Sequence, residues 1–323
     1  MSILTGIDVL LSEPPTWARE ARLGLLYNQA SVDTRLRSSP ILLHEDSRFH
    51  LTTLFGPQHG ISGHQQDNMI EWEGRTDPRT GLPIFSLYGK RRKPNAAMLD
   101  DIDVLLIDLQ DVGARYYTFT WTMYNCMEAC REQGKICAIL DRPNPIGGIS
   151  IEGNLPEPGF SSFVGMKPLA ARHGLTIGEL AHLLAGEFQA DCAVEIVAMR
   201  HWSREMLFEA TGAPWVMPSP NMPTRDTALV YPGMCLLEGT NLSEGRGTTR
   251  PFELFGAPYV DSRGLVDALQ DYGLPGVRFR PAWFQPTFQK HAGRLCGGAQ
   301  IHVTDTACFQ PFRTAVAILH AVR

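Results

Sequence analysis

Residues 103–140 read DVLLIDLQDVGARYYTFTWTMYNCMEACREQGKICAIL, and the pattern of this segment indicates the fold class. It opens with the apolar run DVLLIDL and closes with ICAIL, both of which have the length and composition of a buried strand. Between the two runs, apolar residues recur with the spacing of one helix face: Met123, Cys126, Met127 and Cys130. Gly134 then suits the C-terminus of that helix. Strand, helix and strand in this order predict a βαβ unit and therefore a parallel sheet.

Similar apolar runs lie on both sides of this unit. LGLLY (23–27) and LTTLF (51–55) precede it, and AVEIVAM (193–199) follows it. Before the last of these runs, Thr176 and Glu179 have the spacing of a capping box and open an amphipathic helix. This alternation predicts an α/β fold with a parallel sheet in the first two-thirds of the chain.

The character of the sequence changes near residue 211. The segment 212–258 is rich in Gly, Pro, Ser, Thr and Asn and carries few helical signals. After it, the patterns predict a helix, a strand and a helix in turn: LVDALQDYG (265–273), IHVTD (301–305) and PFRTAVAILHAV (311–322). We therefore expect a large domain over residues 1–251 and a smaller α/β domain over residues 252–323. The chain stops directly after a helix, which favours a truncated second domain.

Composition excludes several classes of function. A net charge of -5 over 323 residues offers no basic surface for nucleic acid. No apolar run approaches the roughly 20 residues that span a bilayer, so no membrane span is expected. The N-terminus lacks a secretory signal, and the seven cysteines include no CxxC pair. These features predict a reduced, cytoplasmic protein; an earlier loss of a leader would instead place it in the periplasm or outside the cell.

Polar side chains follow four of the predicted strands. In open parallel sheets, ligands bind in the crevice outside the carboxyl ends of the strands, so these side chains are candidate site residues. They are Asn28 after the first strand, Gln58 and His59 after the second, Asp108, Gln110, Asp111, Arg115 and Tyr117 at and after the third, and Asp141, Arg142 and Asn144 after the fourth.

A structural interpretation competes with this one. Asp and Asn are also common at strand ends as helix caps and turn residues. Asp108 sits inside an apolar run, where a carboxylate is costly to bury without a partner, and either Arg115 or Arg142 can serve as that partner. Four polar strand ends in succession nevertheless favour a site.

The segment rich in Gly and Pro contributes a second group of candidates. These are Asn221 in PSPNMPT and Glu238, Asn241, Glu244 and Arg246 in LLEGTNLSEGRGTT. A glycine-rich loop can bring such groups close to a ligand or cradle a phosphate through its backbone N–H groups. Neither GxxxxGK[ST] nor GxGxxG occurs, so a standard nucleotide site is not supported. The scattered histidines do not match common metal-ligand spacings, and we expect no metal or other cofactor.

At these motifs the chain resembles a known family, the peptidoglycan exo-β-N-acetylmuramidases, formerly a domain family of unknown function. The resemblance runs from about residue 7 to residue 288, and the matching strings are FGPQHGISG, TGLPIFSLYG, DIDVLLIDLQDVGARYYTFTWTM, LDRPNPIGG, HGLTIGELA, PSPNMPT, YPGMCLLEGTNLSEGRGTTRPFE and GAP. It implies a Rossmann-like N-terminal domain that bears the active site, and a smaller C-terminal domain. It also implies release of N-acetylmuramic acid (MurNAc) from the non-reducing end of peptidoglycan fragments, so that muropeptides or MurNAc-containing disaccharides are the expected partners.

One position departs from the family. Its members usually have Pro-Glu-His-Gly where this chain has Pro57-Gln58-His59-Gly60. An amide keeps the shape of a glutamate but cannot transfer a proton, and general acid–base help contributes roughly 10²- to 10⁴-fold to the rate. Either the chain is an inactivated variant or another carboxylate supplies the acid. The candidates for catalysis are Gln58, His59, Asp108, Asp111, Asp141 and Glu244, with Glu238 as a further carboxylate.

Three functional hypotheses follow. The first is a muramidase in which Arg115, Arg142 or Arg246 grips the lactyl carboxylate, a geometry that a guanidinium favours. The second is a muropeptide-binding protein with weak or no catalysis because of Gln58. The third, an esterase, ranks below both because the chain has no G-x-S-x-G motif.

Overall fold

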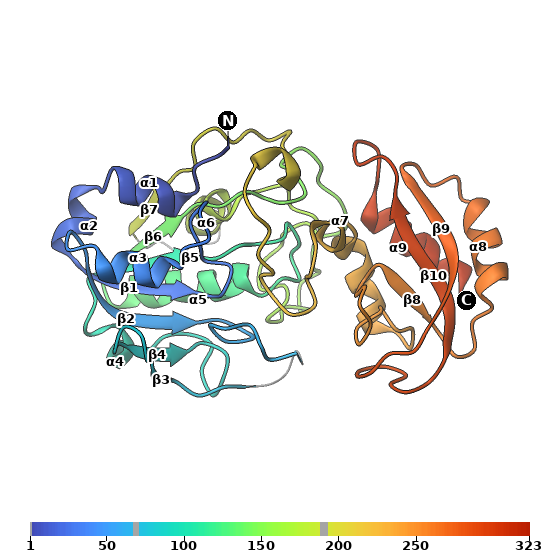
Figure 1. The fold of residues 1–323 in the computed structure, drawn as a ribbon, viewed down its shortest axis with the longest axis horizontal. Coiled ribbons are helices and arrows are strands. Elements are labelled where there is room, and N and C mark those ends of the chain that lie inside the picture. Colours follow the sequence, from blue (N-terminus) through green and yellow to red (C-terminus); the bar gives the residue numbers. More distant parts are fainter. Residues whose placement is uncertain (1, 67–70, 188–192) are drawn as a thin grey trace.

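The fold has two lobes, which Figure 1 shows side by side along the long axis of the molecule. The structure is a computed structural model, and it describes residues 2–66, 71–187 and 193–323. The larger lobe is built on a seven-stranded sheet in the order β3-β4-β2-β1-β5-β6-β7. All neighbours pair in parallel except β3 and β4. The strands are β1 (Arg22–Tyr27), β2 (His50–Gly56), β3 (Arg75–Thr76), β4 (Pro83–Ser86), β5 (Val104–Asp108), β6 (Ile136–Leu140) and β7 (Ala193–Val197).

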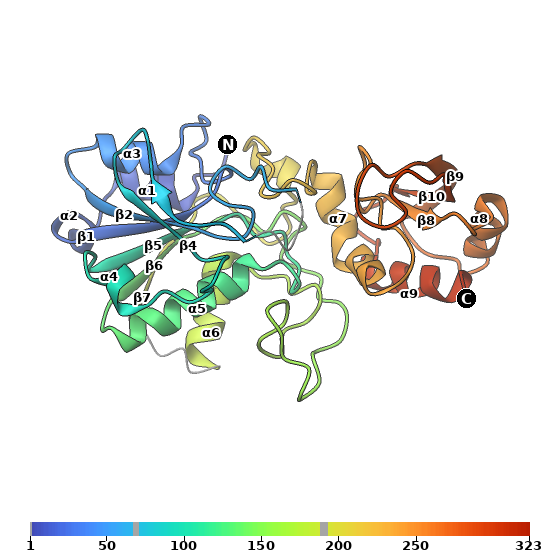
Figure 2. The same ribbon diagram turned by 90° about the horizontal axis from the view of Figure 1, so that it is seen from below.

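Helices cover both faces of this sheet (Figure 2). One face carries α1 (Gly6–Ser12), α2 (Thr16–Glu20) and α3 (Ser39–Glu45), and the other carries α4 (Ala96–Leu99), α5 (Phe119–Glu132) and α6 (Ile177–Gly186). Successive residues of β5 alternate between the two cores, because strand side chains point to opposite faces. Val104 and Leu106 pack on the α1–α3 side, whereas Leu105 and Ile107 pack on the α5–α6 side. The predicted α/β architecture with a mostly parallel sheet is confirmed.

The smaller lobe is an antiparallel sheet with helices. Its three strands, in the order β8-β10-β9, are β8 (Leu254–Ala257), β9 (Val277–Phe284) and β10 (Cys296–Val303). The helix α8 (Ser262–Gln270) packs on β9 and β10, and α9 (Pro311–Ala321) contacts α8. This lobe is the smaller C-terminal α/β unit that the sequence predicts.

The segment 212–258 contains helices that its composition did not predict. They are α7 (Arg225–Met234) and the 3₁₀ helix η2 (Cys235–Gly239), preceded by the short 3₁₀ helix η1 (Phe208–Thr211). Thr224 caps α7 by accepting a hydrogen bond from the Thr227 backbone N–H at 3.2 Å. From Thr227 to Met234 every residue of α7 is buried, so the helix lacks the polar face by which an amphipathic helix is found.

The helix α7 joins the two lobes. It packs against α9, and a Cβ atom at Gly233 would lie 1.9 Å from the Pro311 carbonyl oxygen. The predicted domain boundary near residue 252 stays a prediction, and this packing favours a boundary close to α7. Within the described ranges, no helix is long and apolar enough to cross a membrane.

Candidate active site

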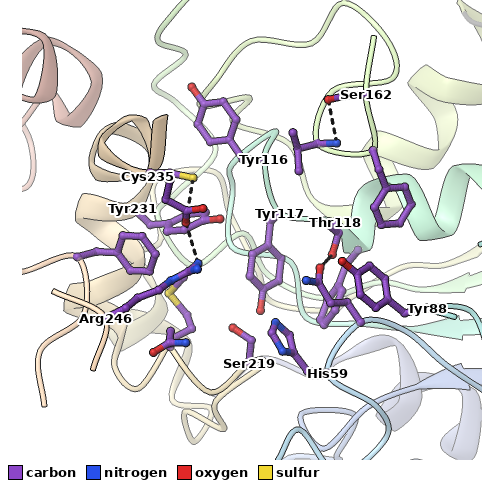
Figure 3. A pocket seen from close by; sticks show the side chains of 18 of the residues that line it. His59, Tyr88, Tyr116, Tyr117, Thr118, Ser162, Ser219, Tyr231, Cys235 and Arg246 are labelled. Atoms are coloured by element: carbon purple, nitrogen blue, oxygen red, sulfur yellow. Dashed lines mark hydrogen bonds and ion pairs between the residues drawn. The ribbon is translucent and has the colours of Figure 1, made fainter. Parts of the chain in front are cut away.

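A cavity of about 460 Å³ opens where loops from the large sheet meet α7 and η2 (Figure 3). Its volume lies within the range of roughly 300–1,000 Å³ that is usual for small-molecule sites. Residues just beyond β2, β4 and β5 form one side, and residues of α7, η2 and the following loop form the other. Six of the residues predicted from sequence line it: Gln58, His59, Tyr117, Asn221, Glu238 and Arg246.

The turn after β2 presents Gln58 and His59 to the cavity. His59 has a left-handed backbone, with φ of 68°, and its Nδ1 lies 2.7 Å from the Gln65 carbonyl oxygen. The Gln58 side-chain oxygen accepts a hydrogen bond from the Thr118 hydroxyl at 2.7 Å. Trp72 supports the turn through a bond from its ring N–H to the Pro57 carbonyl at 3.1 Å. These contacts hold the Gln58 amide and the His59 ring at the end of the sheet.

Aromatic rings form much of the cavity wall. Tyr117 meets Tyr231 edge to face with ring centroids 6.0 Å apart, and Tyr231 meets Phe252 in the same way at 4.8 Å. Figure 3 shows the Tyr117 ring extending toward Ser219 and His59. Rings with polar tips offer both apolar faces and hydrogen-bonding groups, a combination suited to a sugar.

Glu238 is the one carboxylate among the described residues that line the cavity. Its Oε1 accepts a hydrogen bond from Arg246 Nη2 at 2.7 Å. Arg246 Nε also lies 3.8 Å from Glu244, which pairs through its other oxygen with Lys290 at 3.1 Å. Charges of alternating sign thus run from the cavity wall into the junction between the lobes.

The environment of Glu238 favours its protonated form. Burial raises the pKa of its carboxyl above the ordinary value, and nearby Glu244 adds to the rise. The Arg246 guanidinium opposes it. A raised pKa shifts a carboxyl group toward its protonated form, which is the form that a general acid needs.

Asp108 and Arg142 form a buried ion pair that does not line the cavity. The guanidinium makes two bonds to the carboxylate, at 2.5 Å from Nε and 2.9 Å from Nη2. The Ser39 hydroxyl donates to the same carboxylate at 2.5 Å. The sequence left open whether Arg115 or Arg142 pairs with Asp108, and in the structure the partner is Arg142. This ion pair links the end of β5 to the end of β6.

Asp111 and Asp141 also lie outside the cavity lining. Asp111 accepts a bond from the Gly113 N–H at 2.6 Å and lies 3.3 Å from His173 Nε2. Asp141 accepts bonds from the Gly178 N–H at 2.8 Å and the Thr176 hydroxyl at 3.1 Å, at the start of α6. In the structure both carboxylates hold loops or a helix end, and the catalytic role predicted for them stays a prediction.

The remaining predicted residues support loops around the site. Asn28 donates to the Pro218 carbonyl at 2.7 Å, Gln110 to the Pro143 carbonyl at 2.9 Å and Asn144 to the Leu175 carbonyl at 3.0 Å. Arg115 donates to the Leu169 carbonyl and lines a neighbouring pocket of about 440 Å³. Asn241 is exposed and Glu244 is buried beside the cavity. The functional roles predicted for these residues stay predictions.

Sequence reasoning missed several lining residues, chiefly Tyr88, Arg92, Tyr116, Thr118, Phe163, Ser219, Tyr231 and Phe252. Tyr88 and Arg92 follow the short strand β4, which the strand patterns did not reveal. The sequence signal that could have identified this region is TGLPIFSLYG, one of the strings of the family resemblance, which contains β4 and Tyr88. Within the described parts of the chain, no group of three or more His, Cys, Asp or Glu residues is arranged to hold a metal ion.

Fold and site together define a class of protein: an α/β protein whose ring-lined cavity suits a sugar and includes a carboxyl group in its wall. Residues 23–226 match the family model described as the N-terminal part of the exo-β-N-acetylmuramidase NamZ, and residues 229–323 match the C-terminal part. The chain therefore belongs to the NamZ exo-β-N-acetylmuramidase family, a family of glycoside hydrolases.

Individual relatives agree with this assignment. The chain is 48% identical over 320 residues to a peptidoglycan β-N-acetylmuramidase NamZ of Bacillus subtilis (strain 168), covering 99% of this chain and 77% of that protein. Two crystal structures of DUF1343 family proteins from Bacteroides fragilis NCTC 9343 share the fold. The first has a TM-score of 0.93 and 39% identity, and the match covers 99% of this chain and 82% of the chain in that structure. The second has a TM-score of 0.75 and 28% identity, and the match covers 93% of this chain and 76% of the chain in that structure.

Proposed function

We propose that this chain hydrolyses the β-glycosidic bond of a terminal MurNAc residue and so releases MurNAc from the non-reducing end of peptidoglycan fragments. The observation that carries the proposal is Glu238, a carboxyl group with a raised pKa in the wall of a ring-lined cavity. The membership of the chain in the NamZ family supports the choice of sugar. The proposed substrates are muropeptides and MurNAc-containing disaccharides.

In the proposed reaction Glu238 protonates the leaving glycosidic oxygen. Glycoside cleavage needs such a proton donor, because a sugar alkoxide is a poor leaving group. Among the described lining residues there is no second carboxylate. The group that stabilises or attacks the anomeric carbon is then either a carboxylate that approaches only with substrate or the acetamido oxygen of MurNAc itself, as in substrate-assisted glycosidases.

Gln58 has a binding role in this scheme. Its side-chain oxygen accepts a hydrogen bond from the Thr118 hydroxyl, and this bond holds the amide group in the cavity wall, where a sugar would contact it. The Thr118 hydroxyl and the start of α5 border the same part of the cavity. A glutamate at position 58 is therefore not required for the proton transfer that Glu238 performs.

Turnover of chromogenic glycosides tests the proposal. The purified chain should release the chromophore from a β-MurNAc glycoside and much less from the matching β-N-acetylglucosamine (GlcNAc) glycoside. With a MurNAc–GlcNAc disaccharide, free MurNAc and GlcNAc should appear together. Absence of turnover on every MurNAc substrate would overturn the proposed activity.

Gln58 also supports a second candidate function, a muropeptide-binding protein that does not turn over its ligand. This alternative expects saturable MurNAc binding without product. It further expects that Gln58→Glu creates activity that the natural chain lacks. Comparable turnover by the natural chain and by the Gln58→Glu variant would exclude it.

A further inference from the structure

The cavity contains a second arginine, Arg92, whose charge is not balanced by an acidic side chain of the described residues. We infer that Arg92 binds the carboxylate of the substrate's lactyl group and thereby selects MurNAc over GlcNAc. This inference rests on the proposed function, because it assigns a part of the substrate to a part of the same cavity. It differs from the expectation that Arg115, Arg142 or Arg246 performs this role.

Two aromatic rings position the Arg92 guanidinium. Its central carbon lies 4.8 Å from the centre of the Tyr88 ring and 4.4 Å from that of Phe163. The two rings are 6.0 Å apart and tilted by 40°, and both line the cavity with Arg92. Cation–π contacts use the face of a guanidinium and leave its N–H edge available to a planar acceptor. Arg92 is thus held between two rings, and its guanidinium N–H groups have no hydrogen-bond acceptor among the residues that the structure describes.

The pattern of ion pairs singles out Arg92. The neighbouring Lys93 pairs with Glu132 at 2.7 Å and Glu128 at 3.5 Å. Of the polar contacts seen in the described chain, Arg92 makes only one, through its backbone carbonyl, which accepts from the Asn125 amide at 3.1 Å. The half-buried Arg92 side chain therefore brings to the cavity a positive charge that has no ion-pair partner in residues 2–66, 71–187 and 193–323.

The other candidate arginines already have partners. Arg142 donates two hydrogen bonds to Asp108, and Arg246 forms an ion pair with Glu238. Arg115 donates to backbone carbonyls and lines the neighbouring pocket. Of the two arginines that line the cavity in the described part of the chain, Arg92 is the one without a carboxylate partner, so a carboxylate that enters the cavity can pair with it.

The chemistry of the two sugars makes this charge selective. MurNAc differs from GlcNAc by a lactyl ether on O3, which carries a carboxylate. A guanidinium can bind that carboxylate through two parallel hydrogen bonds, whereas GlcNAc offers only a neutral hydroxyl there. Loss of hydrogen bonds to a charged group should weaken binding by about 10- to 100-fold.

Binding of free MurNAc and of its methyl ester, measured by calorimetry or by NMR titration, tests the inference. The ester keeps the sugar and the lactyl carbons but removes the charge. The natural chain should bind MurNAc about 10- to 100-fold more tightly than the ester. The variant Arg92→Gln should bind the two ligands about equally, and Arg92→Lys should keep part of the preference.

Two further variants complete the design. Arg91→Gln removes the adjacent exposed arginine, which does not line the cavity, and should leave the preference intact. Arg115→Gln tests the arginine of the neighbouring pocket. Full preference for MurNAc in Arg92→Gln, or its loss in Arg115→Gln alone, would overturn the inference. If the natural chain shows this binding preference but hydrolyses no MurNAc glycoside, the proposed function fails and the inference stands.

Discussion

Glu238 is the residue on which the proposed chemistry depends. Replacement by Gln keeps the size and the contact with Arg246 but removes the transferable proton. We expect Glu238→Gln to lower kcat/KM on a chromogenic MurNAc glycoside by roughly 10²- to 10⁴-fold. Glu244→Gln is the matched control, because Glu244 is a nearby carboxylate outside the cavity lining. A larger loss in the control than in Glu238→Gln would move the acid role to Glu244.

Arg246 is paired with Glu238 and acts on the pKa of its carboxyl group. Its positive charge lowers the pKa of Glu238, against the rise caused by burial. In Arg246→Met that pKa should rise, so the fall of kcat/KM at high pH should begin at a higher pH than in the natural chain. The measured quantity is the pH at which kcat/KM begins to fall, and the comparison does not depend on how large kcat/KM is in the variant. A limb that stays in place or moves to lower pH would contradict the assignment of Glu238 as the acid.

At the residue scale, the sequence predicted the chemistry of individual side chains better than their location. The need of Asp108 for a partner followed from its place in an apolar run, and Arg142 meets that need. A strand-end carboxylate has the same local sequence whether it caps a helix, as Asp141 does, or faces a ligand. Arg92 went unnoticed because its place in the cavity depends on β4 pairing beside β2.

Asp141, which follows β6 and accepts hydrogen bonds from the start of α6, is a buried carboxyl group that links stability to pH. Burial raises the pKa of Asp141 to about 6, although three hydrogen bonds favour its charged form. The folded pKa thus exceeds the unfolded one, so this group contributes stability below about pH 4 that is lost as the pH rises through about 6.

The variant Asp141→Asn should isolate this effect. Relative to the variant, the natural chain should lose roughly 3 kcal/mol of unfolding free energy between pH 4 and pH 7.5, at about 1.4 kcal/mol for each pKa unit. Urea denaturation of both proteins across this range measures the difference. A difference that does not change with pH, or that changes in the opposite direction, would contradict the raised pKa.

At the element scale, what could be predicted depended on how each element is buried. Strands β1, β2, β5 and β6 were found because continuous apolar runs mark strands covered on both faces. The helix α6 was found through the capping box of Thr176 and Glu179, which the structure confirms. The helix α7 was missed because it is buried all round, and β3 and β4 because they have only two and four residues.

The two lobes form one continuous core, in which residues of α5, α7, β8 and α9 belong to the same apolar cluster. The contact between α7 and α9 depends on the absence of a side chain at Gly233, where a Cβ atom would lie 1.9 Å from Pro311 O. We expect Gly233→Ala to destabilise the protein by about 1–3 kcal/mol, the usual cost of overpacking.

Thermal unfolding of this variant also tests how the lobes are coupled. Because Tyr231, Cys235 and Glu238 line the cavity from the same helical segment, activity should fall together with stability. Gly186→Ala is the control, since a Cβ atom at Gly186 meets nothing within 4 Å. Unchanged stability and activity in Gly233→Ala would show that the lobes do not depend on this contact.

At the scale of the whole molecule, the order of motifs along the chain predicted the family and both lobes, but not the junction between them. The cavity takes Gln58 and His59 from one lobe and Glu238 and Arg246 from the segment that leads into the other. Side chains so far apart in sequence come together only through the packing of α7. No local pattern encodes that packing.

The most direct test of the account is a crystal structure of the Glu238→Gln variant with an intact MurNAc–GlcNAc disaccharide bound. We predict the sugar in the cavity lined by Tyr117, Tyr231 and Phe252, with the glycosidic oxygen within about 3 Å of the position-238 side chain. The lactyl carboxylate should lie against Arg92. A disaccharide bound elsewhere, or one whose glycosidic oxygen faces a different carboxylate such as Asp111 or Glu244, would contradict the account.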